Sequence, residues 1–301
     1  MRHVHGGSIL LERLERDGIG DEYLEISEVL CDGPTPADVE AAGWLDLRAA
    51  HLATLGDDGD AAEIRGALAD TDAALDRWLD EDREEIVLWF GWELFCQSIL
   101  VRLLARLAAR THRPPLSLIS PDGDAEHPGC TVSTRAGDEL RRALAARVPV
   151  GPAHLALAAR VWKAWTAPAP DSLRRLLASA DFTPLPHLRA AVERLLEELP
   201  DDAGLARSER EVLAALANGA ESLGEVMNAA NGMEERQWMT DLLVIDRLRR
   251  LAAADPPLVR WDADEGVGAI TDAGRAVLEG RARHRTAERW VGGTRVSPPP
   301  P

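Results

Sequence analysis

The chain has 301 residues, of which 46% are apolar and 28% are charged, as is usual for globular proteins. This length exceeds what one hydrophobic core usually serves, so two or three domains are expected. No apolar run approaches the roughly 18 residues that span a bilayer, and residues 1–7 lack the apolar stretch of a secretion signal. Three widely spaced cysteines, Cys31, Cys96 and Cys130, argue against a disulfide framework or a Cys-x-x-Cys zinc site. These features predict a cytoplasmic protein with no membrane partner.

The formal net charge is −17, and it is concentrated in the first two thirds of the chain. Residues 205–301 contain 13 Arg against 15 Asp and Glu, a balance of −2, which leaves −15 for residues 1–204. Phosphate backbones bind proteins through Lys and Arg. An acidic surface of this size therefore disfavours nucleic acid as a partner of residues 1–204.

The first 130 residues alternate between strand and helix patterns. Strands are expected at 2–5, 22–28, 85–90 and 116–120, and helices after Ser8 and at 36–54, 61–79 and 92–109. Such alternation implies right-handed βαβ units and a parallel sheet with helices on both faces. The sequence therefore predicts a three-layer, Rossmann-like α/β domain over residues 1–130.

The remainder of the chain divides into three further segments. Residues 131–203 show helical periodicity throughout and predict a helical connector. Residues 204–280 predict a winged-helix-like domain, in which three helices precede a β-hairpin and a last helix. We expect Ser208 and Ser222 to cap the first two of these helices, and the third to run from Glu234 to Ala253. Residues 281–301 form a tail that is basic at first and then rich in proline.

The turn after the first strand is the leading candidate for contact with a ligand. Gly6 and Gly7 let the backbone approach a ligand closely. The helix that follows presents free N–H groups and a positive dipole end to an anion, with the Ser8 hydroxyl beside them. The alternative is a tight turn in which Ser8 only caps the helix.

The histidines and the serine in this segment suggest metal binding or hydrolysis as further functions. His3 and His5 face one side of the strand, but no third ligand stands at a suitable spacing, so a metal site is not predicted. A nucleophile and base formed by Ser8 and His5 is a further hypothesis, which depends on geometry that a sequence does not give. The chain has no G-x-G-x-x-G motif and no P-loop, so no cofactor is specified.

Two further groups follow the ends of later strands. Asp32 would bind a ribose, act as a base or ligate a metal, or else serve only as the first residue of an Asp-Gly-Pro turn. Glu93 and Gln97 stand four residues apart at the start of a helix, so they share one helical face. We expect both to line the ligand crevice beyond the carboxyl ends of the strands.

The expected third helix of the C-terminal domain is poorly suited to DNA. It begins with Glu234 and Glu235, and the tip of the hairpin, residues 262–265, is also acidic. Acidic groups that face phosphates weaken binding. DNA is therefore a disfavoured partner, and a module for a protein partner or for a second copy of the chain is the alternative.

Several motifs occur together along nearly the whole chain. They are His3-Val4-x-Gly6-x-Ser8, Asp32-Gly33-Pro34, Leu88-Trp89-Phe90-x-x-Glu93-Leu94-Phe95-x-Gln97, Leu205-x-x-Ser208-Glu209-Arg210, Asp272-x-Gly274-Arg275-x-Val277-Leu278 and Arg289-Trp290-Val291-Gly292-Gly293. In these motifs the chain resembles an uncharacterised bacterial family, domain of unknown function 1835. The resemblance implies a shared architecture and no particular activity. The family often has Asp at the positions of Gly7 and Glu93, so Glu93 keeps a carboxylate that Gly7 lacks.

These observations lead to one main functional hypothesis and two alternatives. The main hypothesis is a protein that binds a small anionic or phosphorylated molecule, held by Gly6, Gly7 and Ser8 and oriented by the side chains of Asp32, Glu93 and Gln97. Arg289 and Trp290 are expected to fold back and close the crevice. The first alternative is a hydrolase or transferase with His5, Asp32 and Glu93 as acid and base groups. The second is a DNA-binding regulator that works through residues 234–285.

Overall fold

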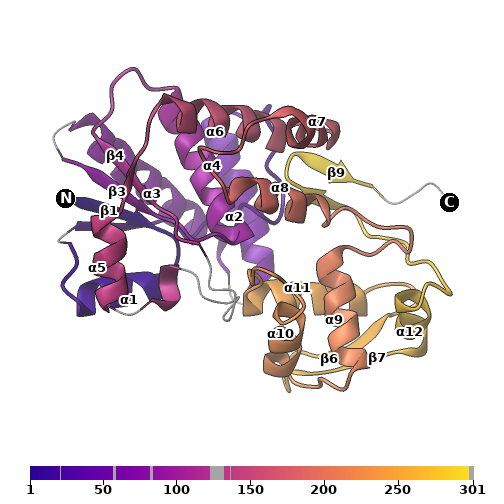
Figure 1. The fold of residues 1–301 in the computed structure, drawn as a ribbon. Helices are drawn as coiled ribbons and strands as arrows, with labels where there is room; N and C mark the ends of the chain where they lie inside the picture. Colours follow the sequence, from indigo (N-terminus) through magenta and orange to yellow (C-terminus); the bar gives the residue numbers. More distant parts are fainter. Residues whose placement is uncertain (21, 57–58, 82–83, 123–131, 136, 298–301) are drawn as a thin grey trace.

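The computed structural model describes residues 1–301 except 21, 57–58, 82–83, 123–131, 136 and 298–301. Cys130, and with it the expected boundary at residue 130, lies outside the described residues. Strands and helices together form a mixed α/β structure (Figure 1). This agrees with the α/β class predicted from the alternating patterns.

A five-stranded sheet forms the centre of the N-terminal half, with the order β2-β1-β3-β4-β5. Its strands are β1 (Arg2–His5), β2 (Glu22–Glu25), β3 (Ile86–Trp89), β4 (Leu116–Ile119) and β5 (Val148–Pro149). The first four pair in parallel, and β5 pairs antiparallel to β4. Every residue of β3 and β4 is buried, as expected for parallel strands covered on both faces.

Strand β5 corrects the expectation that residues 131–203 are helical throughout. Val148 and Pro149 pair with Leu118 and Ser117 of β4, and both are exposed. A proline is tolerated on an edge strand, where its missing N–H costs no ladder hydrogen bond. Two exposed residues show no alternation of apolar and polar side chains, so no pattern marked them as a strand. The central sheet therefore includes part of the expected connector.

Helices cover both faces of the sheet. They are α1 (Ser8–Arg16), α2 (Ala41–Leu55), α3 (Ala61–Asp80), α4 (Leu94–Ala108), α5 (Gly137–Ala145), α6 (Pro152–Trp165), α7 (Asp171–Ser179) and α8 (Leu188–Leu196). Val87 and Trp89 of β3 pack in one apolar cluster with α1 and α5, while Ile86 and Leu88 pack in another with α4. The sheet is therefore the middle of three layers. No helix within the described ranges is both long and apolar enough to cross a membrane.

The C-terminal half contains three helices, a hairpin and a further helix, in the predicted order. These elements are α9 (Arg207–Ala217), α10 (Leu223–Asn231), α11 (Asp241–Ala252), β6 (Val259–Asp262), β7 (Val267–Ile270) and α12 (Asp272–Leu278). Ser222 caps α10 through the backbone N–H of Glu225, and the Glu225 carboxylate accepts from the N–H of Ser222. This capping box was correctly predicted.

Two predicted helix starts in this half are wrong. Helix α9 begins after Ala206, whose N–H donates to Glu209, while Ser208 is buried and bonds to Glu198. Helix α11 begins at Asp241, where the Thr240 side chain accepts from the N–H of Leu243, and not at Glu234.

The tail folds back onto the rest of the molecule. Strands β8 (Arg289–Val291) and β9 (Thr294–Val296) form a hairpin (Figure 1). At its turn the carbonyl of Gly292 accepts from the N–H of Thr35 at 3.1 Å, and the N–H of Gly293 donates to the carbonyl of Trp165 at 2.8 Å. The hairpin therefore joins the segment after β2 to the end of α6.

Candidate functional site

The neighbours of β1 define a point at which the connections leave the sheet on opposite faces. Strand β1 lies between β2 and β3. The chain passes from β1 into α1 on one face, and from β3 into α4 on the other face. In open α/β sheets, ligands bind outside the carboxyl ends of the strands at such a switch point. The turns after His5 and after Trp89 are therefore the natural place for a ligand.

The turn after β1 leaves the start of α1 without a side-chain cap. Gly7 occupies the N-cap position with φ 80° and ψ 142°, a backbone conformation that residues other than glycine rarely adopt. Ser8 is the first helical residue and is exposed, so the expectation that Ser8 caps the helix is wrong. A Cβ atom added to Gly7 would meet nothing within 4 Å. The space beside the Gly7 Cα is therefore open.

His5 lies buried against this turn. Its Nδ1 is 3.2 Å from the carbonyl oxygen of Gly7, and because a carbonyl only accepts, Nδ1 carries the proton. Burial lowers the pKa of His5, more than the nearby carboxylates of Glu25 and Glu15 raise it. The imidazole is therefore neutral, and its buried Nε2 is an acceptor without a partner among the described residues. None of the described hydrogen bonds joins His5 to Ser8, so the nucleophile–base pair is not formed.

The turn after β3 holds a second buried group. Glu93 is the N-cap residue of α4, and its Oε2 has no hydrogen-bond partner among the described residues. Burial raises the pKa of the Glu93 carboxyl, while a hydrogen bond with Cys96 lowers it to a smaller extent. Gly6 lies against Cys96, since a Cβ added to Gly6 would be 3.6 Å from the Cys96 Sγ. The turns after β1 and β3 are thus joined through Cys96.

Gln97 connects the turns of the central strands. Its Nε2 donates to the carbonyl of Gly91 at 2.6 Å and to the Ser120 Oγ at 3.3 Å. Glu93 and Gln97 stand at the same end of α4, as predicted, and the Gln97 side chain is buried. Gln97 therefore positions the turn that carries Glu93. Burial also raises the pKa of the Cys96 thiol well above its usual value, which disfavours the reactive thiolate.

Asp32 belongs to a buried set of ion pairs and not to an open site. Its Oδ2 is 2.5 Å from the Arg247 Nη2, its Oδ1 is 2.9 Å from the His51 Nε2, and Arg250 lies at 3.7 Å. Burial raises the pKa of Asp32, but Arg247 and its other partners hold it well below the usual range. A carboxylate that already faces two arginines and contacts His51 is a poor base and has little capacity for a ribose. The sequence patterns did not reveal Arg247.

The ion pairs extend through the interior between the two halves of the chain. Arg247 also contacts Asp246 at 2.6 Å and Glu198 at 3.6 Å. Arg289 of β8 pairs with Glu209 at 2.8 Å and donates to the carbonyl of Glu198 at 2.9 Å. The Arg289 side chain therefore binds α9 and the turn that follows α8. Trp290, half-buried, follows it in the hairpin. The tail folds back as expected, but Arg289 does not face the turn after β1.

Helix α11 uses the same ion pairs to pack on the N-terminal half. It contacts α2, and Figure 1 shows it at the junction of the two halves. Its Arg247 side chain is only 2% exposed. A helix that enters a DNA groove must present its side chains to bases and phosphates. The third helix is instead occupied by an intramolecular contact.

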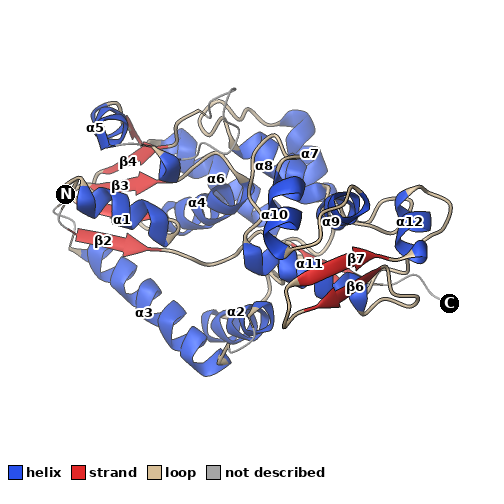
Figure 2. Ribbon diagram, turned by 90° about the horizontal axis from the view of Figure 1, so that it is seen from below, coloured by secondary structure: helices blue, strands red, loops and turns tan. Residues whose placement is uncertain are grey.

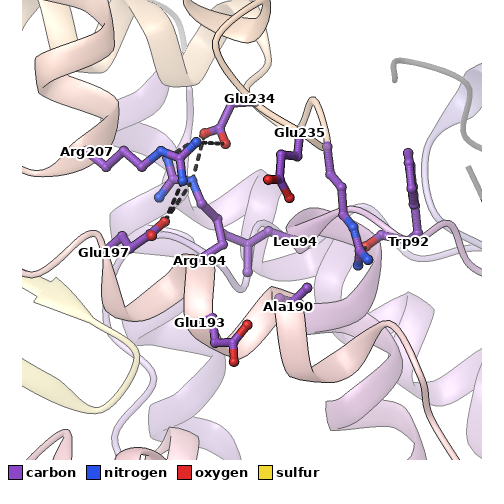
Figure 3. Close-up of a pocket in the computed structure, with 11 residues that line it drawn as sticks. Trp92, Leu94, Ala190, Glu193, Arg194, Glu197, Arg207, Glu234 and Glu235 are labelled. Carbon is purple, nitrogen blue, oxygen red and sulfur yellow. Dashed lines mark hydrogen bonds and ion pairs between the residues drawn. The ribbon is translucent and has the colours of Figure 1, made fainter. Parts of the chain in front are cut away.

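A cavity of about 170 Å³ lies where the turn after β3 meets α8 and the segment before α11. Figure 3 shows Glu234 there, directed towards Arg194 and Arg207, with Trp92 at the opposite end. The Glu234 carboxylate is 2.6 Å from Arg194 and 3.1 Å from Arg207. Glu234 is therefore a buried partner of arginines and cannot face phosphates, contrary to the expectation that it leads the third helix.

Glu211 is expected to make stability fall as the pH rises. Burial and the neighbouring carboxylate of Glu234 raise the pKa of Glu211 to about 7. Between the ordinary pKa of a glutamate and this value, the folded state holds a proton that the unfolded chain has released, so a rising pH favours unfolding. We expect wild type to lose on the order of 1–3 kcal/mol relative to Glu211→Gln between about pH 5 and pH 8, measured by urea unfolding.

The control for this prediction is Glu225→Gln. Hydrogen bonds from the backbone and side chain of Ser222 and from the backbone of Glu221 lower the pKa of Glu225. It therefore titrates below this window, and its variant should run parallel to wild type. Parallel curves for Glu211→Gln and wild type would contradict the prediction.

A scan against models of protein families and a search of curated proteins each find no match to this chain.

Proposed function

We propose that the protein binds a small anionic molecule at the carboxyl edge of its parallel sheet, with the N-terminus of α1 holding the anion. One observation carries this proposal. Helix α1 begins without a side-chain cap at the switch point of the sheet, directly beside the buried and unpartnered Nε2 of His5. Free N–H groups and the positive end of the helix dipole favour an anion at such a position.

The protonation of the neighbouring groups indicates what else the ligand carries. His5 Nε2 is an acceptor, because Nδ1 donates to Gly7. A hydroxyl group next to the anionic group would satisfy it. The Glu93 Oε2, buried without a partner among the described residues, is a second polar group that faces the ligand from the turn after β3. This set fits a hydroxylated phosphate, such as a sugar phosphate.

The two alternative functions have less support from the geometry. The hydrolase or transferase hypothesis requires His5, Asp32 and Glu93 as acid and base groups. Asp32 is unavailable for this role because it contacts Arg247 and His51. The DNA-binding hypothesis requires that the third helix, α11, enter a DNA groove. This helix packs on α2 instead. We therefore propose that the C-terminal three-helix and hairpin module is a winged-helix-like scaffold that supports the binding domain.

The test is calorimetric titration with inorganic phosphate and with ribose 5-phosphate. Ser8→Asp places a carboxylate among the free N–H groups, so we expect both ligands to bind at least about tenfold more weakly, as one competing interaction of about 1.4 kcal/mol would produce. The same change adds about 0.3–1 kcal/mol to the stability of α1 through the helix dipole. Weaker binding by a more stable protein therefore reports on the site and not on folding.

Two further variants complete the design. Ser8→Asn introduces a side chain of nearly the same size as aspartate but without its charge. This variant should bind both ligands as wild type does. His5→Phe should weaken ribose 5-phosphate but not inorganic phosphate, because only the sugar carries the hydroxyl. The proposal fails if wild type binds neither ligand, or if Ser8→Asp binds them as wild type does. Gly7 is left unchanged, since any side chain there is strained at φ 80°.

A further inference from the structure

A cavity of about 380 Å³ lies between α2, α3 and the carboxyl end of β2. Figure 2 shows these two helices side by side below β2. Apolar side chains from the two helices line one part of it, namely Leu45, Leu52, Ile64, Ala67 and Leu68. Its volume is in the range of ligand sites, which are mostly apolar with a few placed polar groups.

The polar end of this cavity contains three carboxylates, and two of them are already neutralised. Glu28 is buried and pairs with Arg48 and Arg102, each at 3.0 Å. Asp72 pairs with Arg106 and lies 3.7 Å from Arg102. Arg48 and Arg106 do not line the cavity, so its described lining carries three carboxylates against the single guanidinium of Arg102, a balance that disfavours an anion.

Glu25 is the third carboxylate, and it differs from the other two. It accepts a hydrogen bond from the Ser27 hydroxyl. No described Arg, Lys or His forms an ion pair with it, and the neighbouring His5 is held neutral by burial. An uncompensated negative charge therefore stands at one end of an apolar cavity, and a cation with an apolar body matches both features.

We propose that this cavity binds an amphiphilic ammonium compound, with its hydrocarbon part between α2 and α3 and its ammonium group against Glu25. Each methylene buried between the helices should raise the affinity about fourfold, which corresponds to about 0.8 kcal/mol. A carboxylate in place of the ammonium would face Glu25 and be repelled. The inference goes beyond the anion site at α1, which has the opposite charge preference.

The experiment is a calorimetric titration of the full chain with hexylammonium, octylammonium and octanoate. We expect octylammonium to bind with one-to-one stoichiometry at least about tenfold more tightly than hexylammonium, since two methylenes are added. Octanoate should bind at least about tenfold more weakly than octylammonium. Equal binding of octanoate and octylammonium would overturn the role of Glu25.

Three variants locate the site. Glu25→Gln should weaken octylammonium by about tenfold, and Ala67→Phe should abolish binding by filling the cavity. Ala73→Phe is the matched control, because Ala73 is an exposed residue of the same helix that does not line the cavity. The proposal is wrong if Ala67→Phe binds octylammonium as Ala73→Phe does. Ser8→Asp should bind octylammonium as wild type does, so a failure here is distinct from a failure of the anion site.

Discussion

Replacing Arg247 with methionine is expected to lower the free energy of unfolding by about 3–5 kcal/mol, the usual cost of breaking a buried ion pair from one side. The guanidinium of Arg247 is 2% exposed and lies between Asp32, Asp246 and Glu198. Methionine fills much of the same volume but leaves these carboxylates with fewer cations. The measurement is urea unfolding followed by tryptophan fluorescence.

Two comparisons separate this effect from a general loss of packing. Arg174→Met removes an ion pair with Asp171, which is 72% exposed, and should cost less than about 1 kcal/mol. Arg247→Met combined with Asp32→Asn should recover part of the loss, because Asp246 and Glu198 keep Arg250 and Arg194 as partners. If Arg247→Met alone were as stable as Arg174→Met, the buried ion pair between Arg247 and Asp32 would not be formed.

Gly293→Ala is expected to detach the tail hairpin and to cost about 2–3 kcal/mol, as other overpacked positions do. A Cβ on Gly293 would stand 2.0 Å from the carbonyl oxygen of Thr166 and 2.2 Å from its carbon. Both are backbone atoms at the end of α6 and cannot rotate away. The hydrogen bond from Gly293 to Trp165 would be lost with the contact.

Limited proteolysis and urea unfolding together test the hairpin. The variant should be cut within residues 286–297 under conditions that leave wild type whole. The control is Gly66→Ala, inside α3, where a Cβ would meet nothing within 4 Å. That change should add about 0.5–1 kcal/mol through helix propensity. If Gly293→Ala resisted protease as wild type does, the hairpin would not occupy this place.

Sequence patterns over a few neighbouring residues were sufficient to predict several strands and helix caps. The buried apolar runs of β3 and β4 and the Ser222–Glu225 capping box were predicted to within about two residues, an ordinary boundary error. The start of α11 was missed because Trp238 and Met239 stand four residues before Leu242 and Leu243, which is helical spacing. Trp238 and Met239 are buried there without being helical. The Thr240 cap was the signal that would have placed it.

The candidate site was predictable in its first turn and not in its surroundings. Consecutive glycines before a helix pointed to the turn at Gly6 and Gly7, because the backbone itself forms that feature. Asp32 stood in an ordinary turn motif, and its partner Arg247 lies 215 positions along the chain. No spacing rule joins residues so far apart, so a buried ion pair was interpreted as a ligand contact. The same reason applies to Arg289 and Glu209.

The pairing of Asp32 with Arg247 also constrains how the chain is made. Synthesis proceeds from the N-terminus at about 5–20 residues per second, so a gap of 215 residues corresponds to about 10–40 s. During this time β1 to β4 can emerge and pair, while the Asp32 carboxylate has no arginine from α11. The hydrogen bond from the N–H of Thr35 to the carbonyl of Gly292 forms later still, because Gly292 is synthesised after α11. The nascent N-terminal half therefore holds the Asp32 carboxylate beside His51 of α2, without its two arginine partners, until the ribosome has delivered α11.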